Sequence, residues 1–355
     1  MVNTTRELEP LVSSIATQVA DSIEEKRLES VLDAITSVQI ESLAGPQQAH
    51  AGRLRSVFQQ PNVVGVGITE QTSRGQRTGQ MAVTFYVEKK LPKTKLSAAK
   101  MIPPKVPNPL NGGPDVPTDV VELGKIKLQA GPFVQKTPIQ PGNSVGHFSG
   151  NAGTLGAIVR RGGKTMILSN SHVLARSGKA KKGDAILYPG KADKGRRPAD
   201  VIAKLDKFTK FIVGGQFVNE LDCAVAELKT GPKARPVNAQ IRGLVAPKGT
   251  TAAKRKMKVQ IAGRTSGVSD VTAIVDTHFR FEVVYPDLNQ SVGFKNQILC
   301  RPPYSQRGDS GALVIEKATG KAVGLHFAGT PKGSVLCPID KVLKNMDVTL
   351  DLPKE

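Results

Sequence analysis

The sequence contains no tryptophan, and aromatic residues make up only 4% of its 355 positions. Proteins that stack on single-stranded nucleic acid place aromatic side chains among basic ones, and this chain has no such interleaved pattern. No stretch approaches 18 consecutive apolar residues, which is the length that a membrane-spanning helix needs. We therefore expect neither specific nucleic-acid binding nor a membrane span.

Cysteine is also scarce, with only Cys223, Cys300 and Cys337 in the chain. An odd number at these spacings fits neither a zinc site nor the disulfide framework of a small secreted protein. A signal peptide would begin with basic residues and an apolar core, whereas this N-terminus carries acidic ones. We predict free thiols in a reducing cytoplasm, with a Cys300–Cys337 disulfide as the alternative.

Charge is plentiful but uneven. Lys and Arg number 50 against 30 Asp and Glu, a net charge of +20, yet residues 1–50 hold three basic and eight acidic residues, a net of −5. The strongly basic remainder favours acidic partners, or serves as a solvated surface that aids solubility. No metal-ligand cluster is evident, and no glycine-rich phosphate loop has the context that nucleotide binding needs. We expect no cofactor and no metal.

Hydrophobic periodicity divides the chain into three predicted domains. Residues 1–46 show apolar positions three or four apart, from Leu8 to Val38, which is typical of amphipathic helices. We interpret this helical arm as a layer packed on its own protein, or else as a docking arm for a protein partner or an intramolecular gate of the site. Residues 47–130 predict a small α/β domain with strands at 63–68, 81–87 and 119–123. Residues 131–355 predict an all-β region that includes strands at 271–276 and 280–285, with residues 177–197 as a basic surface loop.

The most informative segment is Gly308-Asp309-Ser310-Gly311. A serine in a glycine turn, followed by an apolar strand, presents its hydroxyl beside backbone N–H groups that could hold an oxyanion. The same tetrapeptide also suits an ordinary turn. Two other segments favour the catalytic interpretation: His172 follows the apolar run 165–168, and Asp222 precedes the apolar run 223–228.

In chain order these residues stand as His172, Asp222 and Ser310, separated by 50 and 88 positions. With that order and context, the region from about residue 131 to 339 resembles the chymotrypsin-like serine endopeptidases. More narrowly, Ala152–Val159, Ser169–Ala175, Gly263–Gly267 and the serine turn are similar to a non-secreted bacterial branch related to plant NARROW LEAF-type proteases. The resemblance implies two six-stranded antiparallel β-barrels, preceded here by the α/β domain and the helical arm.

The resemblance also implies roles for single residues. His172 would be the general base, Asp222 its orienting partner and Ser310 the nucleophile, with the N–H groups of Gly308 and Ser310 as the oxyanion hole. Asp309 would be the family's aspartate beside the nucleophile, although no activation site that would supply it with a new N-terminus is evident. We attach no chemistry to residues 263–267.

Substrate selection is assigned by the same resemblance. Tyr304, Ser305 and Arg307 would line the primary pocket, and the strand His326-Phe327-Ala328-Gly329 would pair with substrate backbone. His326, neutral or protonated near Arg307, would bind a Glu or Gln side chain, or would only pack. The expected function is a serine endopeptidase acting on a specific protein or peptide substrate under regulation. The alternative is a catalytically silent protease-like adaptor or basic binding module.

Overall fold

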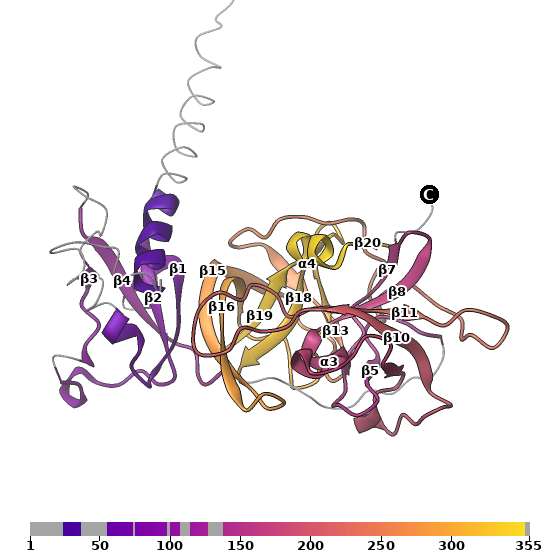
Figure 1. The fold of residues 1–355 in the computed structure, drawn as a ribbon. Coiled ribbons are helices and arrows are strands. Elements are labelled where there is room, and N and C mark those ends of the chain that lie inside the picture. Colours follow the sequence, from indigo (N-terminus) through magenta and orange to yellow (C-terminus); the bar gives the residue numbers. More distant parts are fainter. Residues whose placement is uncertain are drawn as a thin grey trace, which may run out of the picture. The chain divides into compact units, whose positions relative to one another are not determined.

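The computed structural model describes residues 24–36, 55–73, 75–97, 100–106, 114–126 and 138–351 (Figure 1). The chain divides into two compact units, residues 1–122 and 123–355. The domain boundaries predicted at residues 46 and 130 lie outside the described residues. In the parts of the chain that are described, no helix is long and apolar enough to cross a membrane.

The first unit contains a helix and a small mixed sheet. Residues 24–36 are helical, and Leu28, Val31, Leu32 and Ile35 along one face are fully buried, so the helical periodicity is confirmed for this part of the arm. The sheet has the order β1-β2-β4-β3, in which β2 runs antiparallel to β1 and parallel to β4. These elements are β1 (Val63–Ser73), β2 (Gln76–Val87), the 3₁₀ turn η2 (Lys93–Lys95), β3 (Lys105–Val106) and β4 (Val116–Glu122).

The second unit begins with a six-stranded antiparallel barrel of order β7-β8-β11-β10-β9-β5. Its ends meet because Leu155, just before β7, donates to and accepts from residues just before β5. Ile158, Ile167 and Leu205 belong to its core. The strands are β5 (Ser144–His147), β7 (Ala157–Arg161), β8 (Lys164–Ser169), β9 (Ala185–Leu187), β10 (Val201–Phe208) and β11 (Ala224–Leu228), with β6 (Gly153–Thr154) beside β5 and β20 (Thr349–Leu350) beside β7.

The second barrel has the order β12-β17-β18-β19-β16-β15 and closes through direct pairing of β12 with β15. Its hydrophobic core includes Val259, Ile298 and Val314, so each barrel packs around a core of its own. The strands are β12 (Lys258–Gln260), β15 (Thr272–Tyr285), β16 (Gln290–Arg301), β17 (Leu313–Glu316), β18 (Ala322–Thr330) and β19 (Gly333–Pro338). The predicted fold class, a double six-stranded β-barrel after a small α/β unit, is confirmed.

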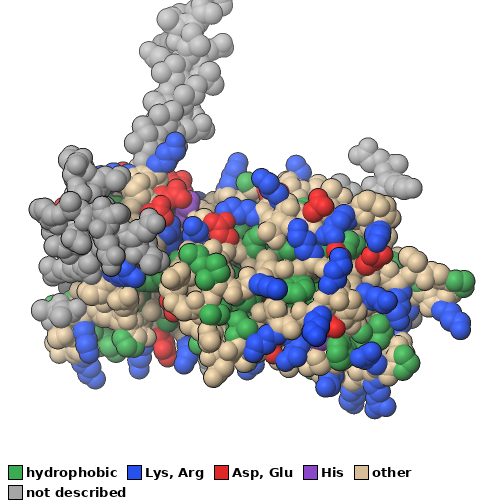
Figure 2. Space-filling model, viewed as in Figure 1, with side chains coloured by type: hydrophobic (Ala, Val, Ile, Leu, Met, Phe, Trp, Pro, Cys, Tyr) green, Lys and Arg blue, Asp and Glu red, His purple; other side chains and the backbone are tan. Residues whose placement is uncertain are grey.

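Short elements connect and flank the barrels. They are α3 (Ser171–Leu174), the 3₁₀ turns η4 (Arg176–Gly178) and η5 (Lys191–Asp193), the hairpin β13 (Ala262–Gly263) and β14 (Gly267–Val268), and the final helix α4 (Ile339–Met346). On the face shown in Figure 2, Lys and Arg side chains are spread over the second unit and outnumber Asp and Glu.

One prediction about this unit was wrong. Residues 177–197 are not simply a basic surface loop, because they contain strand β9 of the first barrel and a buried carboxylate, that of Asp193. The lysines of the segment dominate its composition and suggested exposure. The short apolar stretch Ala185–Leu187 nevertheless pairs with both β10 and β5.

Candidate active site

Asp222 occupies the first barrel just before β11 and is fully buried. Its carboxylate accepts three hydrogen bonds: Oδ1 from the His172 backbone N–H at 3.2 Å, and Oδ2 from His172 Nδ1 at 2.5 Å and the Tyr285 hydroxyl at 2.8 Å. The backbone of Asp222 is held as well, since its carbonyl accepts from the Asn170 amide at 2.7 Å. A carboxylate buried in this way is stabilised only by such donors.

His172 lies on α3, the single helical turn that follows strand β8. Because a carboxylate only accepts hydrogen bonds, Nδ1 carries the proton, and the neutral ring therefore has its lone pair on Nε2. Only 11% of the side chain is exposed. The histidine and aspartate predicted 50 residues apart are thus in direct contact.

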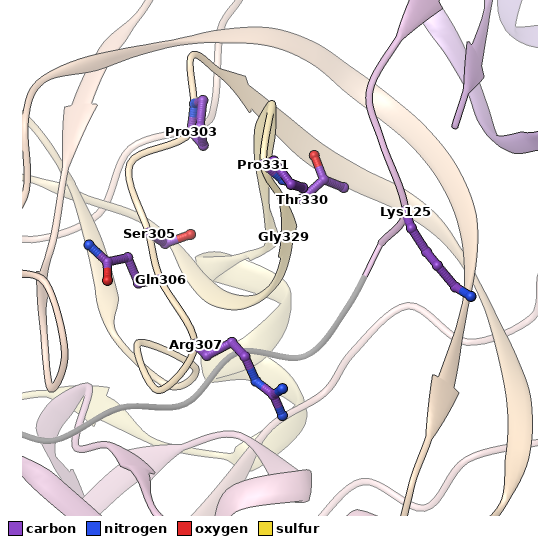
Figure 3. Close-up of a pocket in the computed structure, with 8 residues that line it drawn as sticks. All are labelled: Lys125, Pro303, Ser305, Gln306, Arg307, Gly329, Thr330 and Pro331. Atoms are coloured by element: carbon purple, nitrogen blue, oxygen red, sulfur yellow. The ribbon is translucent and has the colours of Figure 1, made fainter. Parts of the chain in front are cut away.

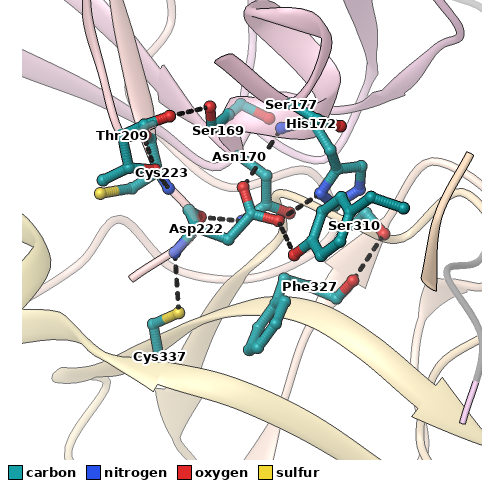
Figure 4. Close-up of polar contacts among 12 residues, drawn as sticks. Ser169, Asn170, His172, Ser177, Thr209, Asp222, Cys223, Ser310, Phe327 and Cys337 are labelled. Carbon is teal, nitrogen blue, oxygen red and sulfur yellow. Dashed lines mark hydrogen bonds and ion pairs between the residues drawn. The ribbon is translucent and has the colours of Figure 1, made fainter. Parts of the chain in front are cut away.

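Ser310 lies in the turn before β17 and is almost completely buried. Figure 4 shows it next to the His172 ring, and its hydroxyl donates to the Phe327 carbonyl at 3.2 Å. The following Gly311 has φ of 96°, and a Cβ there would collide with the Ser169 hydroxyl and the Thr154 carbonyl. Only glycine fits this backbone conformation and this space. The structure therefore brings all three predicted residues to one place, at the junction of the barrels.

The serine turn is held by its carbonyl groups. Thr154 of β6 donates from its hydroxyl to the Gly308 carbonyl at 2.8 Å and from its N–H to the Ser310 carbonyl at 2.7 Å. By contrast, the N–H groups of Gly308 and Ser310 donate to no other described residue. Two backbone donors beside the hydroxyl, left without acceptors, are what an oxyanion site requires.

Asp309, between them, is fully buried. Its carboxylate accepts from the N–H groups of Thr265, Ser266 and Gln306 and from the Ser266 hydroxyl, at 2.6 to 3.1 Å. These donors come largely from residues 263–267, which had no predicted role. The Asp309 carboxylate thus accepts its hydrogen bonds from groups within the folded chain, and none of these donors is a newly formed N-terminus.

A buried ion pair joins the two barrels beside this turn. Arg264 donates from Nε and Nη2 to Asp193 at 2.5 and 2.6 Å, and both side chains are at least 96% buried. Ser144 of β5 also donates to this carboxylate. Burial of both charges carries a desolvation penalty, and the two parallel hydrogen bonds offset part of this free-energy cost. Their pairing was not predicted from the sequence, because the two residues are 71 positions apart.

A pocket of about 430 Å³ opens next to the serine turn (Figure 3). Figure 3 shows the Ser305 hydroxyl pointing toward Gly329, with Arg307 and Lys125 at two sides of the opening. Three residues of the predicted selection set, Ser305, Arg307 and Gly329, line it, together with Lys125, Pro303, Gln306, Thr330 and Pro331. Lys125 was missed because it lies far upstream of every predicted site residue.

The other residues of the selection set are buried next to this pocket rather than lining it. Tyr304, His326, Phe327 and Ala328 are all at most 5% exposed, and the Tyr304 hydroxyl is 3.3 Å from His326 Nδ1. Burial lowers the pKa of His326 to about 3, with a further contribution from the nearby His172. Burial therefore favours the neutral ring at neutral pH, and a role of His326 in substrate selection stays a prediction.

Neighbouring ionisable groups are also held neutral. Burial raises the pKa of Tyr285 and of Cys337 well above their ordinary values, and proximity to the Asp222 carboxylate adds to this effect. Cys223, Cys300 and Cys337 are buried and free. Among the residues that the structure describes, no group of three or more His, Cys, Asp or Glu side chains could hold a metal ion.

Solved structures that are similar to this chain include several described as proteases and one described as a chymotrypsin. Protease A of Thermobifida fusca is 17% identical with a TM-score of 0.43, and the match covers 61% of this chain and 99% of that protein. A glutamic-acid-specific serine protease, described as using a histidine triad in substrate binding, is 16% identical with a TM-score of 0.41. The match covers 60% of this chain and 100% of that protein. A Nocardiopsis protease is 13% identical with a TM-score of 0.42, and the match covers 60% of this chain and 98% of that protein. Because these TM-scores are below 0.5, the fold assignment rests on the strand pairings of the two barrels.

No protein-family model matches the sequence, and no curated protein is significantly similar to it.

Proposed function

We propose that this protein is a serine endopeptidase that hydrolyses peptide bonds through an acyl-enzyme. The observation that carries the proposal is the buried Asp222 carboxylate, which accepts hydrogen bonds from the side chain and the backbone N–H of His172. The His172 ring lies next to Ser310 (Figure 4). This contact fixes the tautomer in which Nε2 can accept a proton, and a serine hydroxyl is a weak nucleophile without such a base.

The proposed reaction begins when the Ser310 hydroxyl rotates from the Phe327 carbonyl toward His172 and attacks the substrate carbonyl carbon. Its proton moves to Nε2, and the N–H groups of Gly308 and Ser310 stabilise the negative oxygen of the tetrahedral adduct. Collapse breaks the C–N bond, and the imidazolium protonates the leaving amine. Water then repeats the sequence and releases the acid and the serine.

The substrate backbone would pair with β18 beyond His326. There, β18 pairs with β19 on one side through Ala328 and Gly329. On the other side, its pairing with β17 ends at Leu325 and Leu313, and the last backbone hydrogen bonds join His326 to Gly311 and Ala312. The strand edge that follows runs alongside Ser310, so an extended peptide added to it would present a carbonyl to the hydroxyl.

We further propose that the pocket selects Glu or Gln in the substrate. Arg307 and Lys125 are both at the pocket, and none of the described residues that line it carries a carboxylate. A substrate cation would be repelled there, whereas a carboxylate would be attracted. The catalytically silent adaptor is not favoured, because a binding role does not require the oriented imidazole. The specific protein substrate and its regulation remain part of the proposal.

The direct test is labelling with a fluorophosphonate, which reacts only with an activated serine. We expect a single labelled site, mapped to Ser310 by peptide mass spectrometry, and loss of labelling in His172→Ala. Folded wild-type protein that shows neither labelling nor hydrolysis of an unfolded protein substrate would contradict the proposed function.

A further inference from the structure

The carboxylate of Asp222 has a third donor, the hydroxyl of Tyr285, which no local sequence pattern indicated. Asp222 belongs to the first barrel and Tyr285 to the second, 63 positions later. The hydroxyl and His172 Nδ1 share the same oxygen, Oδ2, at 2.8 and 2.5 Å. Tyr285 therefore contacts the side of the aspartate that orients the imidazole.

The long β15–β16 hairpin holds Tyr285 in this position. Tyr285 is the last residue of β15 and pairs with Gln290, the first residue of β16. Its carbonyl accepts from the N–H groups of Leu288 and Asn289 in the intervening turn, where Asn289 has φ of 54°. The hydroxyl thus reaches the first barrel from a backbone fixed at the tip of the hairpin.

Aromatic packing fixes the ring itself. Its centroid lies 4.6 Å from that of Phe211 and 6.1 Å from that of Phe294, and the His172 ring meets it edge-on at 6.0 Å. The side chain is fully buried. A ring confined on several sides keeps its hydroxyl aimed at one acceptor, which makes the hydrogen bond directional at little further entropic cost.

The turn of the same hairpin also lies near the segment that carries the histidine. Asp287 is 3.9 Å from the Arg176 guanidinium and 3.5 Å from the Ser177 hydroxyl, and both of these residues follow α3. The hairpin thus contacts the histidine segment as well as the aspartate. A shift of the barrels would disturb both contacts.

We propose that Tyr285 is a positioning residue that holds the Asp222 carboxylate in the plane of the His172 ring and draws negative charge away from Oδ2. The inference rests on the proposed function, because positioning matters only if His172 acts as a base. Loss of the hydroxyl leaves Oδ2 with the imidazole alone, so the carboxylate gains rotational freedom and its field at the ring becomes stronger.

The test compares Tyr285→Phe with Tyr188→Phe in the full-length protein. Tyr188 is the matched control, since it is also fully buried and its hydroxyl donates to the Pro138 carbonyl at 2.9 Å, within the first barrel. We expect kcat to fall about tenfold in Tyr285→Phe with KM nearly unchanged, which is the usual scale for one hydrogen bond to a charged group. Tyr188→Phe should leave both constants close to wild type.

The pH dependence separates positioning from a merely structural role. Around His172, the neighbours Tyr285, His326 and Cys337 stay neutral near neutral pH because of their shifted pKa values, and Asp222 is the charge in direct contact. A stronger field from Asp222 favours the imidazolium. The acid limb of kcat/KM should therefore move to higher pH in Tyr285→Phe, and a lost packing contact alone would not move it.

A measurement that needs no turnover completes the test. The low-field proton NMR resonance of His172 Nδ1–H, assigned by its loss in His172→Ala, should shift or broaden in Tyr285→Phe and stay in place in Tyr188→Phe. An unchanged resonance, or an unchanged kcat and acid limb in an active Tyr285→Phe enzyme, would overturn the inference. Absence of labelling in wild type together with a shifted resonance would instead contradict the proposed function and leave the contact intact.

Discussion

The two barrels contribute to the site in different ways. The first barrel carries a finished unit, in which His172 and Asp222 are joined by two hydrogen bonds. The second carries Ser310, whose hydroxyl donates to the Phe327 carbonyl of its own barrel. The base is thus assembled within one barrel, whereas the nucleophile is positioned by its backbone turn. The relation between the two depends on how the barrels are held together.

Many polar contacts cross from one barrel to the other, and three of them lie at or beside the site. Thr154 donates twice to the serine turn, Arg264 pairs with Asp193, and Tyr285 donates to Asp222. All three contacts cross from one barrel to the other, and all involve buried groups. Because hydrogen bonds away from water are directional and costly to lose, a small number of them can fix the geometry of the site.

The largest expected effect comes from removing the base or the nucleophile. We predict that Ser310→Ala, His172→Ala and Asp222→Asn each lower kcat for peptide hydrolysis by on the order of 10⁴-fold, because the three act as one unit. The double variant Ser310→Ala with His172→Ala should be no slower than either single variant. Steady-state hydrolysis of a protein substrate measures this, with circular dichroism confirming the fold. Ser310→Ala with near-normal activity would remove the assignment.

The next effect concerns the junction rather than either barrel. We predict that Arg264→Met lowers the free energy of unfolding by about 3–5 kcal/mol, because it leaves the Asp193 carboxylate buried without its cation. The change is read from urea unfolding. Lys164→Met is the matched control, since Lys164 and Glu227 form a pair whose side chains are 61% and 41% exposed, and its loss should cost under about 1 kcal/mol.

The double variant Arg264→Met with Asp193→Leu should recover much of the lost stability, since neither charge then remains buried. Equal small losses in Arg264→Met and Lys164→Met would show that the buried pair does not hold the barrels together. This result would assign the connection to the other contacts between the barrels, those of Thr154 and Tyr285 among them.

The sequence predicted the residues of the site better than their partners. His172, Asp222 and Ser310 could be found because each stands at the end of an apolar strand run, a local pattern. Arg264 and Asp193 could not, because a buried ion pair between distant loops has no local signal, and the lysines around Asp193 suggested a surface loop. Tyr285 looked like the end of an ordinary strand.

The fold shows the same division between local and distant information. The strand at 81–87 was expected and lies within β2, whereas the two segments predicted at 271–276 and 280–285 form one strand, β15, with register shifts along it. β-bulges let a strand bend without ending, so composition alone suggested a break. Barrel closure through β12 and β15 depends on pairing that no segment reveals alone.

A smaller effect should appear in the pH dependence of stability of the second barrel. The pKa of His326 is about 3 in the folded protein against 6.5 ordinarily, so the unfolded chain binds more protons between these values. Stability is therefore retained above pH 6.5 and lost as pH falls from there toward 3. The loss attributable to this one group is about 1.4 kcal/mol per pH unit in the middle of that window.

We predict that His326→Leu removes this part of the slope, while the slope due to His147, whose pKa burial also lowers, remains. Urea unfolding between pH 6.5 and 4 measures both proteins. Identical slopes would mean that the His326 ring gains a proton in the folded state, and would favour the protonated alternative for substrate selection.

The smallest expected effect is on substrate choice at the pocket of the second barrel. Arg307 and Lys125 are exposed, and solvent-screened pairs contribute about 0.2–1 kcal/mol, so each should favour a Glu over a Gln substrate by only a few-fold. We predict that Arg307→Ala and Lys125→Ala each reduce the ratio of kcat/KM for matched Glu and Gln peptides, and that 0.5 M salt reduces it in wild type. Lys321→Ala, outside the pocket, is the control.

Product sequencing should show cleavage after Glu or Gln more often than after Lys or Arg. Predominant cleavage after Lys or Arg would contradict the charge argument, and cleavage after small apolar residues would mean that His326 only packs.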